Sequence, residues 1–466
     1  MITANRRAVR DTVRDLFADE RRRLAALVIV SGVLGGAVGA LYLAVLTALQ
    51  HRLFPQHWGM GAHLAIMAVV GILVALLVRV LGAPADVELL VDNIHVAGGP
   101  DDIRSLRSLI PISLLCVGAG GPLGPEAPLV TTTGSLSSWL GLRAGFERDQ
   151  LRILSITGMA AGFTVLFAAP LGSAVFALEI LHRRGLEYYE ALLPAAVGSL
   201  CGYAVLTMAT GAGLTPMWHL PSPHALHTAD LGYAILAGVI GTIVGLAFTY
   251  LTVALRWLAR FAPPDSRPVI GAVALSLLAV ASPYALTNGE LQINHLTVAK
   301  VAVGTLLLGA AAKLVASAVA MATGWRGGFI IPLFFIGFCI GRATEGHLPG
   351  GNSWVFAASL MVAANVAVTK TPIGSTLVVT EMAGMVLLPT TLIASLVALV
   401  LSSPIELIET QQERFDPLGA GTDTTNEDET DAADRAREER DGWAGITDDP
   451  PDVSTGPTVP TGPTDR

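Results

Sequence analysis

Apolar residues dominate the chain from Leu24 to about Ile408, in segments separated by short polar or Gly/Pro-rich stretches. Several segments reach the roughly 20 residues that a helix needs to cross the hydrocarbon core of a membrane. Others are shorter or are interrupted by Gly and Pro. The pattern predicts an all-α polytopic membrane protein. The clearest apolar segments are 24–50, 62–82, 109–120, 153–181, 191–211, 230–255, 268–286, 298–322, 329–341, 354–368, 373–388 and 390–408.

Gly and Pro interrupt the apolar segments often, since the chain contains 49 Gly and 27 Pro. This frequency predicts helices that are broken, tilted or re-entrant. Non-helical backbone is stable at membrane depth only where other protein or a water-filled cavity covers it. The broken segments therefore indicate a permeation pathway rather than a simple membrane anchor.

Charge divides the chain into three parts. Charged residues make up 14% of the sequence, against roughly 25% in ordinary globular proteins. Residues 418–466 hold 13 acids and 4 bases, whereas the other 417 residues hold 24 acids and 25 bases. We expect an N-terminal segment 1–23, a transmembrane domain 24–417 with halves at about 24–211 and 230–410, and a disordered acidic tail 418–466.

The N-terminal segment contains seven arginines and four acids before the first apolar run. By the positive-inside rule this end is expected in the cytoplasm. Its polar start is unlike a cleavable signal peptide, so none is expected.

Two motifs occur twice in the same order. The sequence Pro-[Leu/Ile]-Gly-Ser followed by Glu nine residues after the Pro occurs at 170–179 and at 372–381, 202 residues apart. Upstream of each copy is Gly-x3-Pro, as Gly124-Pro-Glu-Ala-Pro128 and as Gly328-Phe-Ile-Ile-Pro332. Gly/Pro-rich membrane sequence can produce such matches by coincidence. The shared order and offset favour internal duplication, which is common among transporters, with substrate sites where discontinuous helices of the two halves meet.

The first Gly-x3-Pro motif holds the best candidate site residue. A helix is expected to begin near Ala127, which would leave unpaired N–H groups and a partial positive charge beside Glu126. An ionisable residue inside a membrane is costly and is a functional candidate by default, although a capping acid near the membrane surface is the alternative. The second motif offers backbone amides and the nearby Arg326, but no acid. If the two breaks converge, they form a pocket suited to an anion for which Glu126 competes.

The remaining polar residues are weaker indicators of function than Glu126. Glu179 and Glu381 occupy matching positions on two helices, and a role in capping or tying helices together is favoured over a functional one. The three cysteines lie in apolar runs, and no His/Cys cluster indicates a metal. The sequence indicates no cofactor and no nucleic-acid partner. An intramembrane enzyme remains the alternative from another class, but no catalytic serine or acid pair is evident.

These motifs resemble those of the CLC family of chloride channels and chloride/proton antiporters, over residues 24–415. The family signatures G-[KR]-E-G-P and G-x-F-x-P correspond to Gly124–Pro128 and Gly328–Pro332. The resemblance implies two inverted-topology halves of tilted helices and a homodimer with one pore per subunit in a lipid bilayer. It makes Glu126 the gating residue and the amides of Phe329 and Ile330 anion ligands. The full expected anion-binding set is Gly124, Pro125, Ala127, Gly328, Phe329, Ile330, Ile331 and Ile408.

The chain also departs from the family pattern. The G-S-G-x-P signature aligns near Gly82–Asp86, where there is no serine, and Ile330 stands where the second signature has phenylalanine. Ile180 occupies the position of the inner proton-transfer glutamate. The pore tyrosine is absent from Pro404–Gln411, where Ile408 or Glu406 takes its place. We therefore expect channel-like transport of chloride or a similar small anion across the cell membrane, without tight proton coupling. A chloride/proton antiporter of the same fold is the alternative.

Overall fold

The computed structural model describes residues 20–407, except 54–58, 85–86, 100–102, 183–187, 212–217, 219, 222–224 and 405–406. All described residues belong to one compact unit that spans residues 1–414. Most of the N-terminal segment, Ile408 and the acidic tail 418–466 lie outside the described residues.

The described chain is almost entirely helical, as the apolar pattern predicts. The first half contains α2 (Glu20–Leu53), α3 (Met60–Leu81), α4 (Val87–Ala97), α5 (Leu106–Gly118), α6 (Glu126–Arg143), α7 (Arg148–Phe167), α8 (Pro170–Glu179), η1 (Tyr189–Ala191) and α9 (Leu192–Thr210). The second half contains α10 (Thr228–Ala259), η2 (Pro264–Ser266), α11 (Arg267–Ala281), η3 (Pro283–Ala285), α12 (Glu290–Val298), α13 (Val303–Ala322), α14 (Ile330–Arg342), α15 (Ser353–Thr369), α16 (Pro372–Ala383), η4 (Met385–Leu387) and α17 (Leu388–Ser402).

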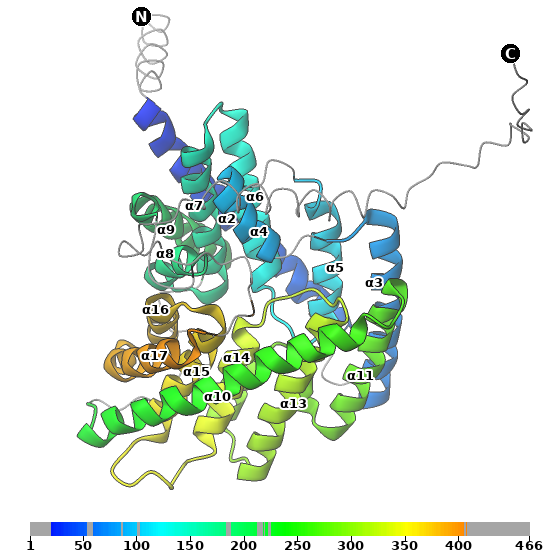
Figure 1. The fold of residues 1–466 in the computed structure, drawn as a ribbon, viewed down its shortest axis with the longest axis vertical. Coiled ribbons are helices and arrows are strands. Elements are labelled where there is room, and N and C mark those ends of the chain that lie inside the picture. Colours follow the sequence, from blue (N-terminus) through cyan, green and yellow to red (C-terminus); the bar gives the residue numbers. More distant parts are fainter. Residues whose placement is uncertain are drawn as a thin grey trace, which may run out of the picture. The chain divides into compact units, whose positions relative to one another are not determined.

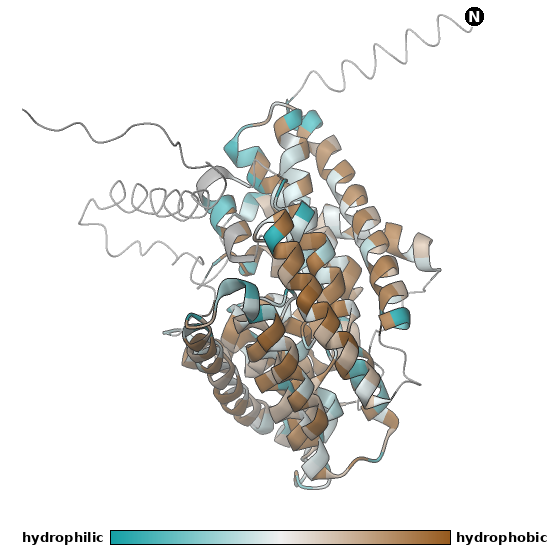
Figure 2. Ribbon diagram, turned by 90° about the vertical axis from the view of Figure 1, so that its right-hand side faces the viewer, coloured by the Kyte–Doolittle hydropathy of each residue, from teal (hydrophilic) through white to brown (hydrophobic). Residues whose placement is uncertain are grey.

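Eight of the described helical segments are long and apolar enough to span a membrane, judged by length and composition. Apolar residues predominate along them (Figure 2). Three further apolar helices, α5, α14 and α15, are shorter than 18 residues. The prediction of a polytopic helical membrane protein with several interrupted helices is confirmed.

One apolar segment of the sequence proves to be two helices. Residues 153–181 contain most of α7 and all of α8, because Ala168 adopts a left-handed conformation with φ of 49° and Pro170 begins the next helix. A proline fits the first turn of a helix, where its missing N–H removes no hydrogen bond. The same break recurs between α15 and α16, where Lys370 has φ of 60° and Pro372 follows.

Apart from α3, which packs against α11, the helices of the first half and those of the second half occupy different regions of the unit (Figure 1). The duplicated helices α8 and α16 pack side by side where the two regions meet. The duplication seen in the sequence is therefore a structural repeat whose copies contact each other.

Glu179 and Glu381 tie these two helices together reciprocally. Glu179, the last residue of α8, accepts hydrogen bonds from the backbone N–H groups of Ile373 and Gly374, at 3.2 and 2.6 Å, in the first turn of α16. Glu381 in turn accepts from Leu171 and Gly172 of α8, at 3.3 and 2.9 Å. Each acid thus satisfies N–H groups at a helix start that have no partner inside their own helix. The capping role favoured from the sequence is confirmed.

We expect Glu179→Gln and Glu381→Gln each to lower the free energy of unfolding by about 1–3 kcal/mol, because each weakens a pair of charge-assisted hydrogen bonds. Thermal unfolding of the purified protein in detergent measures the change. The exposed Glu190 supplies the control, since Glu190→Gln removes no comparable cap. Equal melting temperatures for all three variants and the unmodified protein would contradict the capping role.

Candidate functional site

The two Gly-x3-Pro motifs meet in the interior. The N–H of Gly124 donates to the carbonyl of Gly328 at 2.8 Å, and the N–H of Gly328 donates to the carbonyl of Gly124 at 2.6 Å. This pair is an isolated antiparallel bridge. The two chain breaks, 204 residues apart in sequence, therefore converge and satisfy each other's backbone polar groups.

Each break is followed directly by a helix. Helix α6 begins at Glu126 after Pro125, and α14 begins at Ile330 after Phe329. The start of α6 lies one residue before the position expected from the sequence. Both helices therefore present N-termini, with their partial positive charge, close to the same glycine pair.

Glu126 occupies the space between these helix starts. Its side chain is fully buried, and Oε1 accepts a hydrogen bond from the backbone N–H of Ile331 at 2.7 Å. Oε2 is also buried and has no hydrogen-bond partner among the described residues. Burial opposes the ionised carboxylate, whereas the amide and the two helix ends stabilise it. The carboxylate thus lies at a helix N-terminus, which is a favourable place for a small anion.

The position of this carboxylate explains why residues 124 and 328 are both glycine. A Cβ on Gly124 would lie 2.1 Å from Glu126 Oε2, and one on Gly328 would lie 2.5 Å from the same atom. Neither position has space for a side chain while Glu126 is bound to the Ile331 amide.

Hydrogen bonds from the second half hold the chain that leads to Glu126. Ser317 on α13 donates to the carbonyl of Pro122 at 3.0 Å, and the N–H of Thr287 donates to the carbonyl of Gly120 at 2.7 Å. The fully buried Lys313, also on α13, donates to the carbonyls of Leu286 and Thr287. Sequence reasoning missed this support. Its only visible signal was a lysine inside the apolar segment 298–322.

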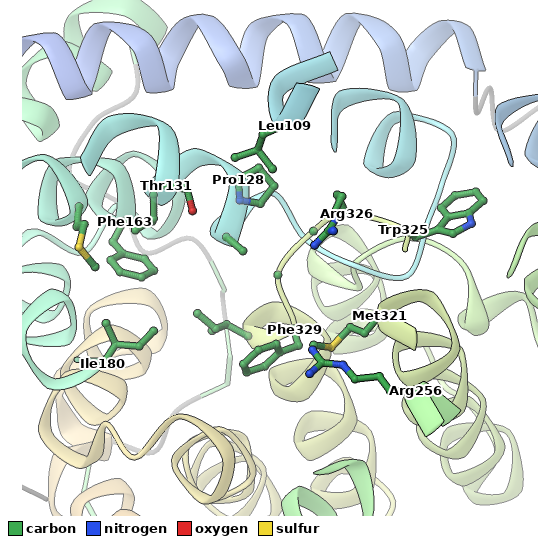
Figure 3. A pocket seen from close by; sticks show the side chains of 16 residues that line it. Leu109, Pro128, Thr131, Phe163, Ile180, Arg256, Met321, Trp325, Arg326 and Phe329 are labelled. Atoms are coloured by element: carbon green, nitrogen blue, oxygen red, sulfur yellow. The ribbon is translucent and has the colours of Figure 1, made fainter. Parts of the chain in front are cut away.

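The other predicted anion-binding residues are distributed around this centre. The amides of Gly124 and Gly328 are paired with each other, and Pro125 has no N–H. A pocket beside the glycine pair is lined by Ala127, Gly328, Phe329 and Ile330, among others (Figure 3). Ile331 contacts Glu126. Ile408 lies outside the described residues.

No set of three or more His, Cys, Asp or Glu side chains gathers as a metal site within the described part of the chain. The three cysteines are free thiols. Among the described residues, this centre therefore offers a carboxylate and backbone amides beside a pocket.

A buried carboxylate held between discontinuous helices is typical of polytopic ion transport proteins. The model of the voltage gated chloride channel family matches residues 84–403. The chain therefore belongs to the CLC family of anion transport proteins, and it is a multi-pass membrane protein.

Relatives and solved structures agree with this assignment. The chain is 26% identical over 415 residues to the chloride/fluoride channel protein of Pseudomonas syringae pv. tomato, covering 84% of this chain and 85% of that protein. It is 27% identical to a voltage-gated ClC-type chloride channel of Citrobacter koseri, covering 69% and 77%. The crystal structure of a CLC-type fluoride/proton antiporter superposes with a TM-score of 0.75 at 25% identity, covering 85% and 99%. A slow cyanobacterial Cl⁻/H⁺ antiporter has the same fold, with a TM-score of 0.73 at 20% identity, covering 89% and 99%.

Gly328→Ala should displace the Glu126 carboxylate, because the added Cβ would also lie 2.9 Å from the Cβ of Glu126. We expect the hydrogen bond to Ile331 to be lost in a structure of the variant, and the protein to lose about 1–3 kcal/mol of stability through overpacking. Gly232→Ala in α10 is the matched control, since a Cβ there meets nothing within 4 Å. A variant structure that retains the bond between Glu126 and Ile331 would disprove the steric argument.

Proposed function

We propose that this protein conducts chloride or a similar small anion across the cell membrane, along a path through the Glu126 position. The observation that carries the proposal is the hydrogen bond from the Ile331 N–H to Glu126 Oε1, at 2.7 Å. It holds a side-chain anion at the start of α14, where a mobile anion would find the same amide and the same helix end.

Under this proposal Glu126 is the gate. The ionised carboxylate competes with the transported anion for the Ile331 amide and blocks the path. A protonated carboxyl has no charge to compete with and is a weaker acceptor, so it leaves the position to the anion. The neighbouring glycines fit closely around the side chain in the blocked state and add no side chain of their own to the path.

We further propose that transport is channel-like and not tightly coupled to protons. Ile180, which lines the pocket beside the glycine pair, has no titratable group to pass a proton inward. The adjacent acid, Glu179, has its oxygens on the amides of Ile373 and Gly374, so a proton relay there would have to break the cap of α16. The alternative is an antiporter, favoured by the likeness to a fluoride/proton antiporter structure.

The remaining proposals concern assembly and orientation. We propose a homodimer with one pore per subunit, on the basis of family membership. We also propose a cytoplasmic N-terminus, on the basis of the seven arginines before the first apolar segment.

Glu126→Gln should give high anion flux that no longer depends on pH, because the amide cannot ionise. In the unmodified protein flux should rise as pH falls, since protonation of Glu126 opens the path. Chloride and fluoride efflux from liposomes, measured with ion-selective electrodes between about pH 7 and about pH 5, tests both statements. A variant with the original pH dependence would exclude Glu126 as the gate.

The reversal potential in liposomes under opposed chloride and pH gradients tests the coupling. We expect it to follow the chloride gradient alone, because Ile180 offers no proton acceptor. A steady shift with the pH gradient, in a fixed ratio to chloride, would identify an antiporter instead.

A further inference from the structure

Lys313 on α13 is a fully buried cation that donates its hydrogen bonds to backbone carbonyls. The acceptors are the carbonyls of Leu286, at 2.6 Å, and of Thr287. Lys313 forms no ion pair with an Asp or Glu of the described residues. Burying an ammonium group costs much free energy unless hydrogen bonds compensate for the lost water. A lysine here therefore indicates that these two bonds contribute something that an apolar side chain could not.

The other buried lysine of the described chain, Lys370, has an ordinary role. It donates to the carbonyls of Ala367, at 2.7 Å, and Ser402, at 2.6 Å. Ala367 lies in the last turn of α15 and Ser402 is the last residue of α17, and carbonyls at helix ends commonly pair with a lysine. Lys313 instead binds the loop between η3 and α12, whose carbonyls do not end an α-helix.

The loop that Lys313 binds contains a strained residue. Thr287 has φ of 61°, a left-handed conformation that is unfavourable for a β-branched residue. Such a conformation persists only where the surrounding contacts enforce it. Both backbone polar groups of Thr287 are engaged, since its carbonyl accepts from Lys313 and its N–H donates to the carbonyl of Gly120 at 2.7 Å. Thr287 thus links Lys313 to the chain that leads to Glu126.

A second contact from α13 reaches the same chain. Ser317 lies four residues after Lys313, so the two side chains project from one face of the helix. Its Oγ donates to the carbonyl of Pro122 at 3.0 Å. Helix α13 therefore holds the chain at residues 120 and 122, directly before α6 begins at Glu126. These contacts fix where the Glu126 carboxylate lies relative to the Ile331 amide.

Lys313 also contacts the helix that provides this amide. Its Nζ lies 5.1 Å from the ring centre of Phe335, a favourable cation–π distance, and Phe335 follows Ile331 by one turn of α14. A Cβ on Gly289 would lie 2.6 Å from the Cβ of Phe335, so the loop itself packs closely on α14. One buried ammonium group therefore joins both partners of the bond between Glu126 and Ile331.

We propose that Lys313 is a positioning residue for the gate, which holds the Glu126 carboxylate on the Ile331 amide by clamping the Thr287 loop against residues 120–122 and α14. The inference rests on the proposed function of Glu126 as the gate. In this role Lys313 acts through the backbone and not on the transported anion. Because the blocked state is the one with the ionised carboxylate on the amide, a weaker clamp destabilises the blocked state. The path should then open at a higher pH.

Other titratable side chains lie near Lys313 and Glu126. They are Cys339 on α14 and Tyr284 on η3 beside Lys313, and Glu290 on α12 and Tyr42 on α2 beside Glu126. Helices α10 and α11 also pack on α13, and none of their described charged side chains interacts with Lys313. The variants below leave all these groups unchanged, so a shift in the pH dependence of flux reports on the clamp.

Lys313→Met removes both hydrogen bonds and keeps an unbranched side chain of similar length. The pH of half-maximal chloride flux in liposomes should rise by about one unit, which corresponds to a tenfold weaker hold on the ionised carboxylate. Ser317→Ala, a milder change to the same clamp, should raise this pH by a smaller amount. Lys370→Met is the matched control, because it removes a buried lysine that binds carbonyls elsewhere. It should lower the melting temperature in detergent without moving the pH of half-maximal flux.

A double variant tests whether Lys313 acts through the gate. Residues that act through one another give non-additive effects when both are changed. Lys313→Met added to Glu126→Gln should therefore leave flux as high and as independent of pH as in Glu126→Gln alone. A further change in flux in the double variant would show that Lys313 acts on the path by another route, and would overturn the positioning role.

The outcomes separate this role from the proposed function. An unchanged pH of half-maximal flux in both Lys313→Met and Ser317→Ala would overturn the positioning role and leave Glu126 as the gate. An equal shift in Lys370→Met would also overturn it, because the shift would then reflect a general loss of stability. If the unmodified protein shows no flux, transport is rejected and a structure of Lys313→Met decides. Loss of the bond between Glu126 and Ile331 in that structure would support the positioning role, and its retention would overturn it.

Discussion

The reciprocal backbone pairing of Gly124 with Gly328 is the interaction on which the centre of this protein depends. Two chain breaks inside an apolar body would leave N–H and C=O groups without partners, at a cost of several kcal/mol per group. Here the breaks pair with each other, which brings the starts of α6 and α14 to one place. The absence of side chains on both glycines leaves the space that the Glu126 carboxylate fills.

At the contact between α8 and α16, backbone groups at a chain break are again satisfied by partners from the other half. Each helix begins with a proline after a left-handed residue, and each receives a cap from the glutamate at the far end of the other helix. A membrane interior provides little water for unpaired helix termini, so partners must come from the protein itself. Duplication supplies both partners at once, because each of these two breaks has a counterpart in the other half.

The centre proposed as the anion path is also the place where the two halves differ. At the central contact the first half contributes an acid, Glu126, and the second contributes the Ile331 amide. Two identical halves would place either two acids or none at this contact, and neither arrangement would hold a single carboxylate at a helix start.

The amino-acid sequence by itself determined the helical membrane class and the duplication, and it singled out Glu126 as the candidate site residue, because these depend on local pattern. Apolar runs, repeated Gly and Pro, and an isolated acid in an apolar setting keep their meaning without knowledge of the fold. Only the tertiary structure decided that the Gly124 and Gly328 amides bind each other, that Ile331 donates to Glu126, and that Lys313 supports the approaching chain. Those contacts join residues tens to hundreds of positions apart, and sequence spacing sets no direction for an amide or a side chain.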